Sequence, residues 1–160
     1  MSAVFTQEKF RGGIAADDKY WEALADGEFR LCRCAQCGTW MVPAHYRCGA
    51  CGSWEQVWPL VEPLGTIYSW TRTRMAFPRT EARADDVPFV TALVEVDGTD
   101  GARIFGIVVD TGTAPHIGDR VRGEIRPGTE KSFGYPTIEW QLVDAPTPAP
   151  GAGSTEGARA

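Results

Sequence analysis

RCAQCGTWMVPAHYRCGACGS, residues 33–53, contains two Cys-x-x-Cys pairs that are separated by ten residues. A Cys-x-x-Cys turn places two thiolates on one side of a tight loop, and two facing turns complete a tetrahedral shell of four sulfurs around Zn2+. A glycine follows each pair, and glycine tolerates the positive φ that suits such a turn. The spacing therefore predicts a zinc ribbon with four metal ligands: Cys34, Cys37, Cys48 and Cys51.

Two disulfides or a redox dithiol are the alternatives for these cysteines. Both are weaker, because no secretory signal is recognisable at the N-terminus and a redox motif needs only one pair. Four thiolates leave no coordination position for water or substrate, so we expect a structural zinc ion. Cys32 is interpreted as a small buried hydrophobe, with a role as a spare ligand as the alternative. His45 is expected at the surface or in packing rather than on the metal.

The charge of the chain disfavours a general nucleic-acid binder. The chain has 160 residues and a formal net charge of −5, with a sequence pI of about 5.0, whereas phosphate binding draws on an excess of Lys and Arg. No apolar run approaches the roughly 20 residues that a membrane span requires. We therefore expect a cytoplasmic protein, in a compartment where thiolates remain reduced and hold metal.

Residues 17–29 predict a short amphipathic helix before the ribbon. Asp17 or Asp18 is placed to cap its start, and Gly27 to end it. Its apolar residues recur at near-helical spacing: Tyr20, Trp21, Leu24 and Phe29. This aromatic face either docks on another protein or packs against its own ribbon, and the sequence leaves both possibilities open.

After residue 53 the sequence predicts β-structure. Five segments rich in β-branched and aromatic residues are the expected strands: 65–75, 88–97, 103–111, 117–128 and 136–143. Asp97-Gly98 is a hairpin signal, and no helical stretch is recognisable between the strands, which argues against a parallel sheet. Five such strands suit an OB-type barrel, whereas a β-sandwich normally needs about seven. The predicted fold class is mainly β: an N-terminal helix, a rubredoxin-like zinc ribbon and a five-stranded OB-fold barrel.

Four parts follow from these elements. The expected divisions are a helical docking segment at 1–31, a zinc ribbon at 32–58, the barrel at 59–143 and a tail at 144–160. The tail consists largely of Pro, Gly, Ala and Ser, without aromatic or branched apolar side chains. Such a composition buries too little surface to offset its ordering entropy, so we expect disorder there.

The order of these parts resembles the DUF35 family of zinc-ribbon/OB-fold proteins. The resemblance extends over roughly residues 15–143, and its most specific parts are the four cysteines and the strand GTIYSWT at 65–71. The segment PFVTALVEV at 88–96 adds to it. Within the family, the chain is similar to DUF35 partners of thiolase-fold enzymes in actinobacterial steroid side-chain catabolism.

This resemblance implies an accessory subunit of an enzyme that acts on acyl-coenzyme A. The barrel would line a passage for the coenzyme A arm, while a thiolase-fold, lipid-transfer-protein-like partner supplies the catalytic groups. A retro-aldolase that cleaves a steroid side-chain CoA thioester is the expected activity of the complex. Partnership with a MaoC-type enoyl-CoA hydratase is one alternative, and a single-stranded nucleic-acid binder, disfavoured by the acidic charge, is another.

Arginines after the 65–71 strand are the candidates for binding coenzyme A phosphates. Many relatives carry a histidine there, whereas this chain has Arg72-Thr73-Arg74, which puts a pantetheine contact from that position in question. Arginine's planar fork binds phosphate oxygens well, so we select Arg72, Arg74 and Arg79, with Arg83 in the same run. A solvated loop, or a patch that pairs with an acidic partner surface, is the alternative. Aromatic residues that could flank the acyl arm, or instead belong to the core, are Trp70, Phe77, Phe89 and Phe133.

The sequence contains no recognisable catalytic constellation. His45 and His116 have no evident nucleophile beside them, and Asp85 and Asp86 are adjacent residues of a loop that are expected to be solvated. The segment TGTAPHIG at 111–118 lacks the lysine and the strand-to-helix context of a P-loop. We therefore expect no catalytic residue in this chain.

Overall fold

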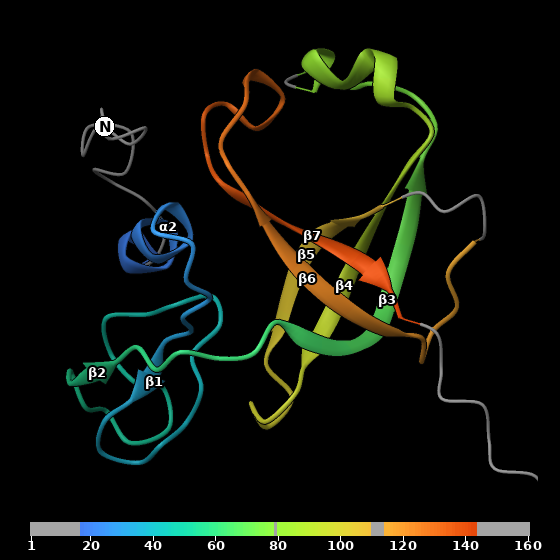
Figure 1. Cartoon of the computed structure of the whole chain (residues 1–160). Coiled ribbons are helices and arrows are strands. Elements are labelled where there is room, and N and C mark those ends of the chain that lie inside the picture. The colour runs from blue at the N-terminus through green and yellow to red at the C-terminus, as the bar shows by residue number, and fades with distance from the viewer. Residues whose placement is uncertain (1–16, 79, 110–113, 144–160) are drawn as a thin grey trace, which may run out of the picture.

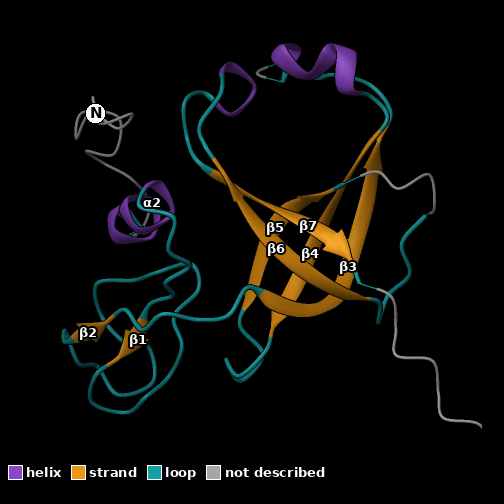
Figure 2. Cartoon of the chain, viewed as in Figure 1, coloured by secondary structure: helices purple, strands orange, loops and turns teal. Residues whose placement is uncertain are grey.

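The computed structural model describes residues 17–78, 80–109 and 114–143. A helix and a small cysteine-rich module lie beside a β-barrel (Figures 1 and 2). Most described residues in regular structure are in strands, and the expected fold class is confirmed. The predicted tail at 144–160 and most of the segment 1–31 before the helix lie outside the described residues.

Helix α2 (Asp18–Ala25) has the position that the aromatic periodicity predicts. Asp17 is at its N-cap, yet its side chain makes no capping hydrogen bond. The Asp17 Oδ1 atom instead accepts a hydrogen bond from the backbone N–H of Ala44 at 2.9 Å, which ties the start of the helix to the ribbon. After the helix, Gly27 adopts a φ of 80°, a left-handed conformation typical of the residue that ends a helix.

The ribbon contains very little regular structure. Strands β1 (Arg33–Cys34) and β2 (Gln56–Val57) form a two-residue antiparallel ladder in which Cys34 is opposite Gln56. Its buried side chains are small or sulfur-containing: Cys32, Cys34, Met41, Ala44 and Cys48. Such a core is too small to hold a fold alone, so metal binding must supply much of the ribbon's stability.

The barrel consists of β3 (Leu64–Thr73), β4 (Phe89–Val96), β5 (Arg103–Val108), β6 (Arg120–Arg126) and β7 (Thr137–Leu142). It closes in the order β3-β4-β5-β7-β6, and every pair is antiparallel except β5 with β7. In β4, alternate side chains are buried, as the sequence alternation requires. This is the five-stranded closed barrel of an OB-fold.

Two 3-10 helices interrupt the barrel sequence, η1 (Glu81–Asp86) and η2 (Glu130–Ser132). The expectation that no helical stretch intervenes was therefore wrong at these two points. Both helices lie at the same end of the barrel (Figure 2). They are six and three residues long, too short for an apolar periodicity by which to recognise them.

Helix α2 packs on the barrel of its own chain. Leu24, Phe29 and Leu31 share one buried core with the barrel residues. The Phe29 ring lies edge-on to the fully buried Trp140 of β7, with centroids 6.4 Å apart, and Trp21 meets Tyr135 in the same manner at 5.3 Å. The aromatic face is thus used within the chain, and it contacts the barrel as well as the ribbon side.

No helix among the described residues is long and apolar enough to cross a membrane.

Replacement of Leu24 by alanine should destabilise the protein by about 2–5 kcal/mol, because Leu24 is 2% exposed in the core shared by helix and barrel. The matched control is Leu60→Ala, since Leu60 is 61% exposed. Urea unfolding of the zinc-loaded chain measures both. Equal unfolding midpoints for the two variants would show that helix α2 does not contribute to the barrel's core.

Candidate metal centre and ligand cleft

The four predicted ligands meet at one point of the ribbon. The Sγ atoms of Cys34, Cys37, Cys48 and Cys51 all lie within 4.8 Å of one another. The Cys34–Cys51 and Cys37–Cys48 sulfurs are each 3.6 Å apart. Zn–S bonds of about 2.3 Å in a tetrahedron place sulfurs about 3.8 Å apart, so the donor set and its size fit a zinc ion. None of the five cysteines is in a disulfide, which rejects the two-disulfide alternative for this structure.

Each Cys-x-x-Cys-Gly segment, 34–38 and 48–52, forms a turn that we call a knuckle. The two knuckles have nearly identical backbones. In the first, the Gly38 N–H donates to the Cys34 carbonyl at 3.0 Å, and Gly38 has a φ of 75°. In the second, the Gly52 N–H donates to the Cys48 carbonyl at 2.9 Å, with a φ of 78° at Gly52. Glycine is required here because this region of φ is unfavourable for residues with a Cβ atom.

An arginine side chain forms a hydrogen bond with the backbone of each knuckle. The Nε–H of Arg33 donates to the Gly38 carbonyl at 2.6 Å, and that of Arg47 donates to the Gly52 carbonyl at 3.0 Å. Each guanidinium also lies over a tryptophan ring, Arg33 over Trp40 at 5.2 Å and Arg47 over Trp54 at 5.8 Å. Sequence reasoning recognised only the cysteines and glycines, although the repeat of Arg-Cys-x-x-Cys-Gly-(Thr/Ser)-Trp at 33–40 and 47–54 contains this signal.

Hydrogen bonds set the proton affinities of the ligand thiols. The Thr39 hydroxyl, 3.2 Å from the Cys37 Sγ, and the Thr39 backbone N–H lower the pKa of Cys37 to about 6. The Ser53 N–H lowers the pKa of Cys51, but the neighbouring thiols and burial raise it to about 12. A bound Zn2+ deprotonates all of its thiol ligands. Zinc binding therefore releases the proton that the raised pKa keeps on Cys51 in the metal-free site.

Two residues near the cluster are not ligands. Cys32 is 1% exposed in the ribbon core, and burial, with the charge of Asp17, raises its pKa to about 11. Its sulfur is outside the four-sulfur group. The side chain of His45 is exposed, and its carbonyl accepts a hydrogen bond from Gln56.

The residues proposed for coenzyme A fall into separate environments. Arg72 and Arg74 are exposed, and neither forms an ion pair within the described part of the chain. Trp70 is half-buried and packs against the core, and Phe89 is half-buried beneath the Arg83 guanidinium, 5.8 Å from its ring centroid. Arg79 lies outside the described residues.

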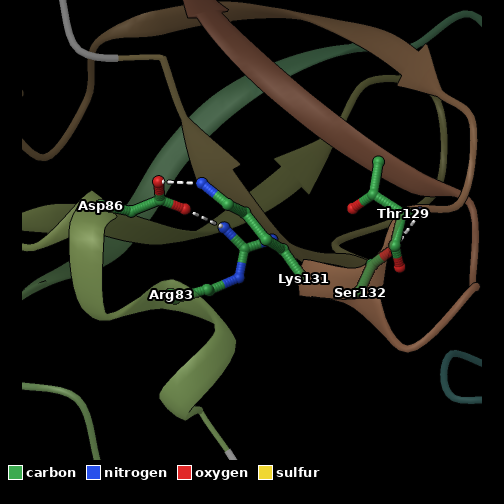
Figure 3. A network of polar contacts seen from close by, with 5 residues as sticks. All are labelled: Arg83, Asp86, Thr129, Lys131 and Ser132. Carbon is green, nitrogen blue, oxygen red and sulfur yellow. Dashed lines mark hydrogen bonds and ion pairs between the residues drawn. The ribbon is translucent and has the colours of Figure 1, made fainter.

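A salt bridge joins η1 to η2 beside these residues (Figure 3). Asp86 accepts from Arg83 at 3.3 Å and from Lys131 of η2. Thr129 and Ser132 form a capping box at the N-terminus of η2. Arg83 and Asp86 are therefore already paired, and the expectation that Asp86 is a solvated loop residue was wrong. Two exposed aromatic residues flank these helices: Phe77 lies between β3 and η1, and Phe133 directly follows η2.

A cleft lies along the seam between the ribbon, helix α2 and strand β5. Its main part has a volume of about 410 Å3 and is lined by apolar side chains: Tyr20, Trp21, Met41, Trp58, Ile104 and Phe105. A smaller hollow of about 160 Å3 shares Tyr20, Trp21 and Phe105 and extends to Thr91 and Ile107. Sequence reasoning missed this cleft, because it forms only where two separately predicted domains meet.

Two charged residues line the cleft, and both have partners: Asp17 accepts from the Ala44 N–H, and Arg103 pairs with a carboxylate. Arg103 donates to Glu95 at 3.0 Å, and its guanidinium lies 3.5 Å from the ring centroid of Tyr68. The cleft therefore offers apolar surface with little free positive charge. This chemistry suits an uncharged or aliphatic group.

Replacement of Cys48 by serine should abolish stoichiometric zinc binding and yield poorly soluble protein, since metal binding contributes on the order of 10 kcal/mol to such ribbons. Cys32→Ala is the matched control and should retain one zinc per chain, measured by elemental analysis. Zinc loss in Cys32→Ala would assign Cys32 to the metal site.

Cys32 should resist alkylation in the native protein at pH 8. Because its pKa is raised to about 11, the thiol stays protonated there, and its reactivity should increase only as the pH approaches that value. Iodoacetamide labelling and peptide mass spectrometry measure this, with urea-denatured protein as the control. Rapid labelling of the native protein would contradict the burial of this thiol.

Comparison with known proteins agrees with this architecture. The model of the ChsH2 rubredoxin-like zinc ribbon domain matches residues 21–55, and that of the ChsH2 C-terminal OB-fold domain matches residues 58–126. No curated protein matches the chain.

Two solved structures are similar to the chain. A chain of the Ltp2-ChsH2(DUF35) aldolase has 26% identity and a TM-score of 0.64, over 81% of this chain and 97% of that one. A DUF35 protein of unknown function from Sulfolobus solfataricus has 16% identity and a TM-score of 0.55, over 85% and 91% of the two chains, and shows the fold alone. With both ChsH2 domains present in order, the chain belongs to the DUF35 family of zinc-ribbon/OB-fold proteins.

Proposed function

We propose that this chain is the accessory subunit of an acyl-CoA lyase complex, in which a thiolase-fold partner cleaves a steroid side-chain CoA thioester by a retro-aldol reaction. The observation that carries the proposal is the similarity to a chain of the Ltp2-ChsH2(DUF35) aldolase, which spans 97% of that chain and so includes ribbon and barrel together. The conserved arrangement of both domains supports a conserved mode of assembly.

The chemistry of the described residues supports a division of labour with the partner. Four thiolates occupy every coordination position of a tetrahedral zinc ion, so the metal has no open position for a substrate. Of the two histidines, His45 is exposed, and His116 is 79% exposed and lies 3.6 Å from Asp119. We therefore assign the reacting groups to the partner and binding and positioning to this chain.

Coenzyme A would contact two adjoining regions of the barrel. Arg72 and Arg74, which are exposed and form no ion pair with another described residue, offer guanidinium groups to phosphates. In the sheet, Thr71 is opposite Thr91, which lines the smaller hollow, so the hollow begins one strand spacing, about 5 Å, from the strand that carries Arg72. The nucleotide would bind at the arginines, with Phe89 beside it, and the pantetheine or acyl arm would enter the apolar cleft past Phe105.

Co-expression with the thiolase-fold subunit of the same host tests the assembly. We expect the two chains to co-purify in a stable complex that cleaves a β-hydroxyacyl-CoA with a steroid side chain, while neither chain alone is active. A MaoC-type subunit offered in parallel serves as the control. Assembly with the MaoC-type subunit alone would exclude the aldolase role.

The combined variant Arg72→Ala/Arg74→Ala should raise the KM of the complex for acyl-CoA several-fold and change kcat little, because phosphate contacts are far from the scissile bond. Arg122→Ala, at an exposed arginine of β6, is the matched control. Unchanged kinetics in the double variant would eliminate the phosphate role of this strand end.

Phe105→Ala should weaken binding of a long-chain acyl-CoA much more than of acetyl-CoA, because only a long chain reaches the cleft. Phe105 is 69% exposed, so its replacement should leave stability unchanged. The control is Phe77→Ala, since Phe77 is similarly exposed, at 57%, and lies between β3 and η1, outside the lining of the cleft. Equal KM changes for both acyl lengths would contradict a role of the cleft in acyl binding.

A further inference from the structure

The arginine that precedes each cysteine pair reaches the metal centre through one peptide unit. Arg33 donates to the carbonyl oxygen of Gly38 at 2.6 Å. The N–H of the same Gly38–Thr39 peptide belongs to Thr39, and it donates to the Cys37 sulfur. The C=O and N–H of a trans peptide point in opposite directions, so a group that holds the oxygen also fixes the direction of the N–H.

The second knuckle repeats this relay, by which we mean the contacts from the arginine to a peptide carbonyl and from the N–H of the same peptide to a ligand sulfur. Arg47 donates to the Gly52 carbonyl at 3.0 Å, and the N–H at the other end of that peptide, from Ser53, donates to the Cys51 sulfur. Two segments 14 positions apart in the sequence thus build the same chain of contacts, from guanidinium to peptide to sulfur. The repetition indicates a feature of the metal centre rather than an incidental surface contact.

These contacts give a second reason, besides the positive φ, why a glycine follows each cysteine pair. A Cβ atom at position 38 would lie 2.9 Å from the Arg33 terminal nitrogen, and one at position 52 would lie 3.2 Å from that of Arg47. A side chain at either position would crowd the guanidinium that holds the peptide. The glycine therefore provides room for the arginine as well as the turn itself.

A positive charge at the carbonyl end strengthens the donor at the other end. Hydrogen bonds in a chain polarise one another, and bonds with a charged partner are stronger than neutral ones. The N–H then stabilises negative charge on the ligand sulfur. Groups that orient metal ligands in this indirect manner typically contribute 10–100-fold to metal affinity.

We propose that Arg33 and Arg47 are positioning residues of the zinc centre, each of which orients and polarises the single peptide that donates to the sulfur of Cys37 or Cys51. The two knuckles are matched by this device even though their hydroxyl groups differ. The Thr39 hydroxyl lies 3.2 Å from the Cys37 sulfur, whereas the Ser53 hydroxyl accepts from the Glu55 N–H at 3.1 Å. Cys51 thus has the peptide donor without a hydroxyl, and loss of Arg47 should have the larger effect.

Methionine variants of the full-length, zinc-loaded chain test the proposal, because methionine retains bulk without charge or donor. Arg30→Met is the matched control. Arg30 also donates to a backbone carbonyl, that of Trp58 at 2.9 Å, but the next residue is Pro59, which has no N–H to pass to a sulfur. The measurements are the rate of zinc transfer to a colorimetric chelator and the thiolate-to-cobalt absorption band of the Co2+-substituted chain.

We expect zinc release to be at least about 10-fold faster in Arg47→Met, with a smaller increase in Arg33→Met. The cobalt band should shift to lower energy in both, because a thiolate that loses a hydrogen bond is a better electron donor. Arg30→Met should change neither quantity, and Arg47→Lys, which keeps a charge and a donor, should recover part of the loss.

Release rates and cobalt spectra equal to those of Arg30→Met would overturn the proposal. Faster release with an unchanged cobalt band would also overturn it, because the arginines would then stabilise only the fold. If Arg33→Met does not fold, Arg47→Met and Arg47→Lys decide, since Arg47 is outside the strands and beside the exposed Trp54, whereas Arg33 is in β1 beside the core-packed Trp40. Neither assay requires a partner subunit, so the result is independent of the proposed function.

Discussion

Four thiolates that converge on one metal ion hold together a ribbon that has almost no other source of stability. Its only ladder is the two-residue pairing of β1 with β2, and its buried core consists of a few small or sulfur-containing side chains. Metal binding can supply on the order of 10 kcal/mol to such a module. The position of the ribbon residues that line the cleft, Met41 and Trp58 among them, therefore depends on the metal.

The barrel and the ribbon are joined through side chains as well as through the chain. Phe29 and Leu24 extend the barrel core to the helix, and Asp17 connects the helix to Ala44 of the ribbon. The helix thus packs between the two modules, which also meet directly where Trp40 and Val42 of the ribbon pack against the same core. Because both modules are fixed to it, the apolar cleft at the seam keeps a defined shape, which a binding site requires.

A closed metal site is compatible with the positioning role that we propose for this chain. The zinc ion shapes the fold, the cleft offers apolar surface, and Arg72 and Arg74 are exposed. In the proposed complex, the steroid thioester is held partly by this chain and cleaved by the other. Substrate recognition and chemistry then reside on different subunits, which can change separately.

Elements with a local cause could be predicted from the amino-acid sequence. The Cys-x-x-Cys pairs identified the metal ligands, the alternation in β4 indicated which side chains are buried, and the helix periodicity located α2. Three features could not be predicted in this way: the parallel pairing of β5 with β7, the ion pairs of Asp86 and the cleft beside Phe105. These features join residues far apart in the sequence, and no local pattern encodes a contact whose geometry depends on how the barrel closes and how the ribbon packs against it.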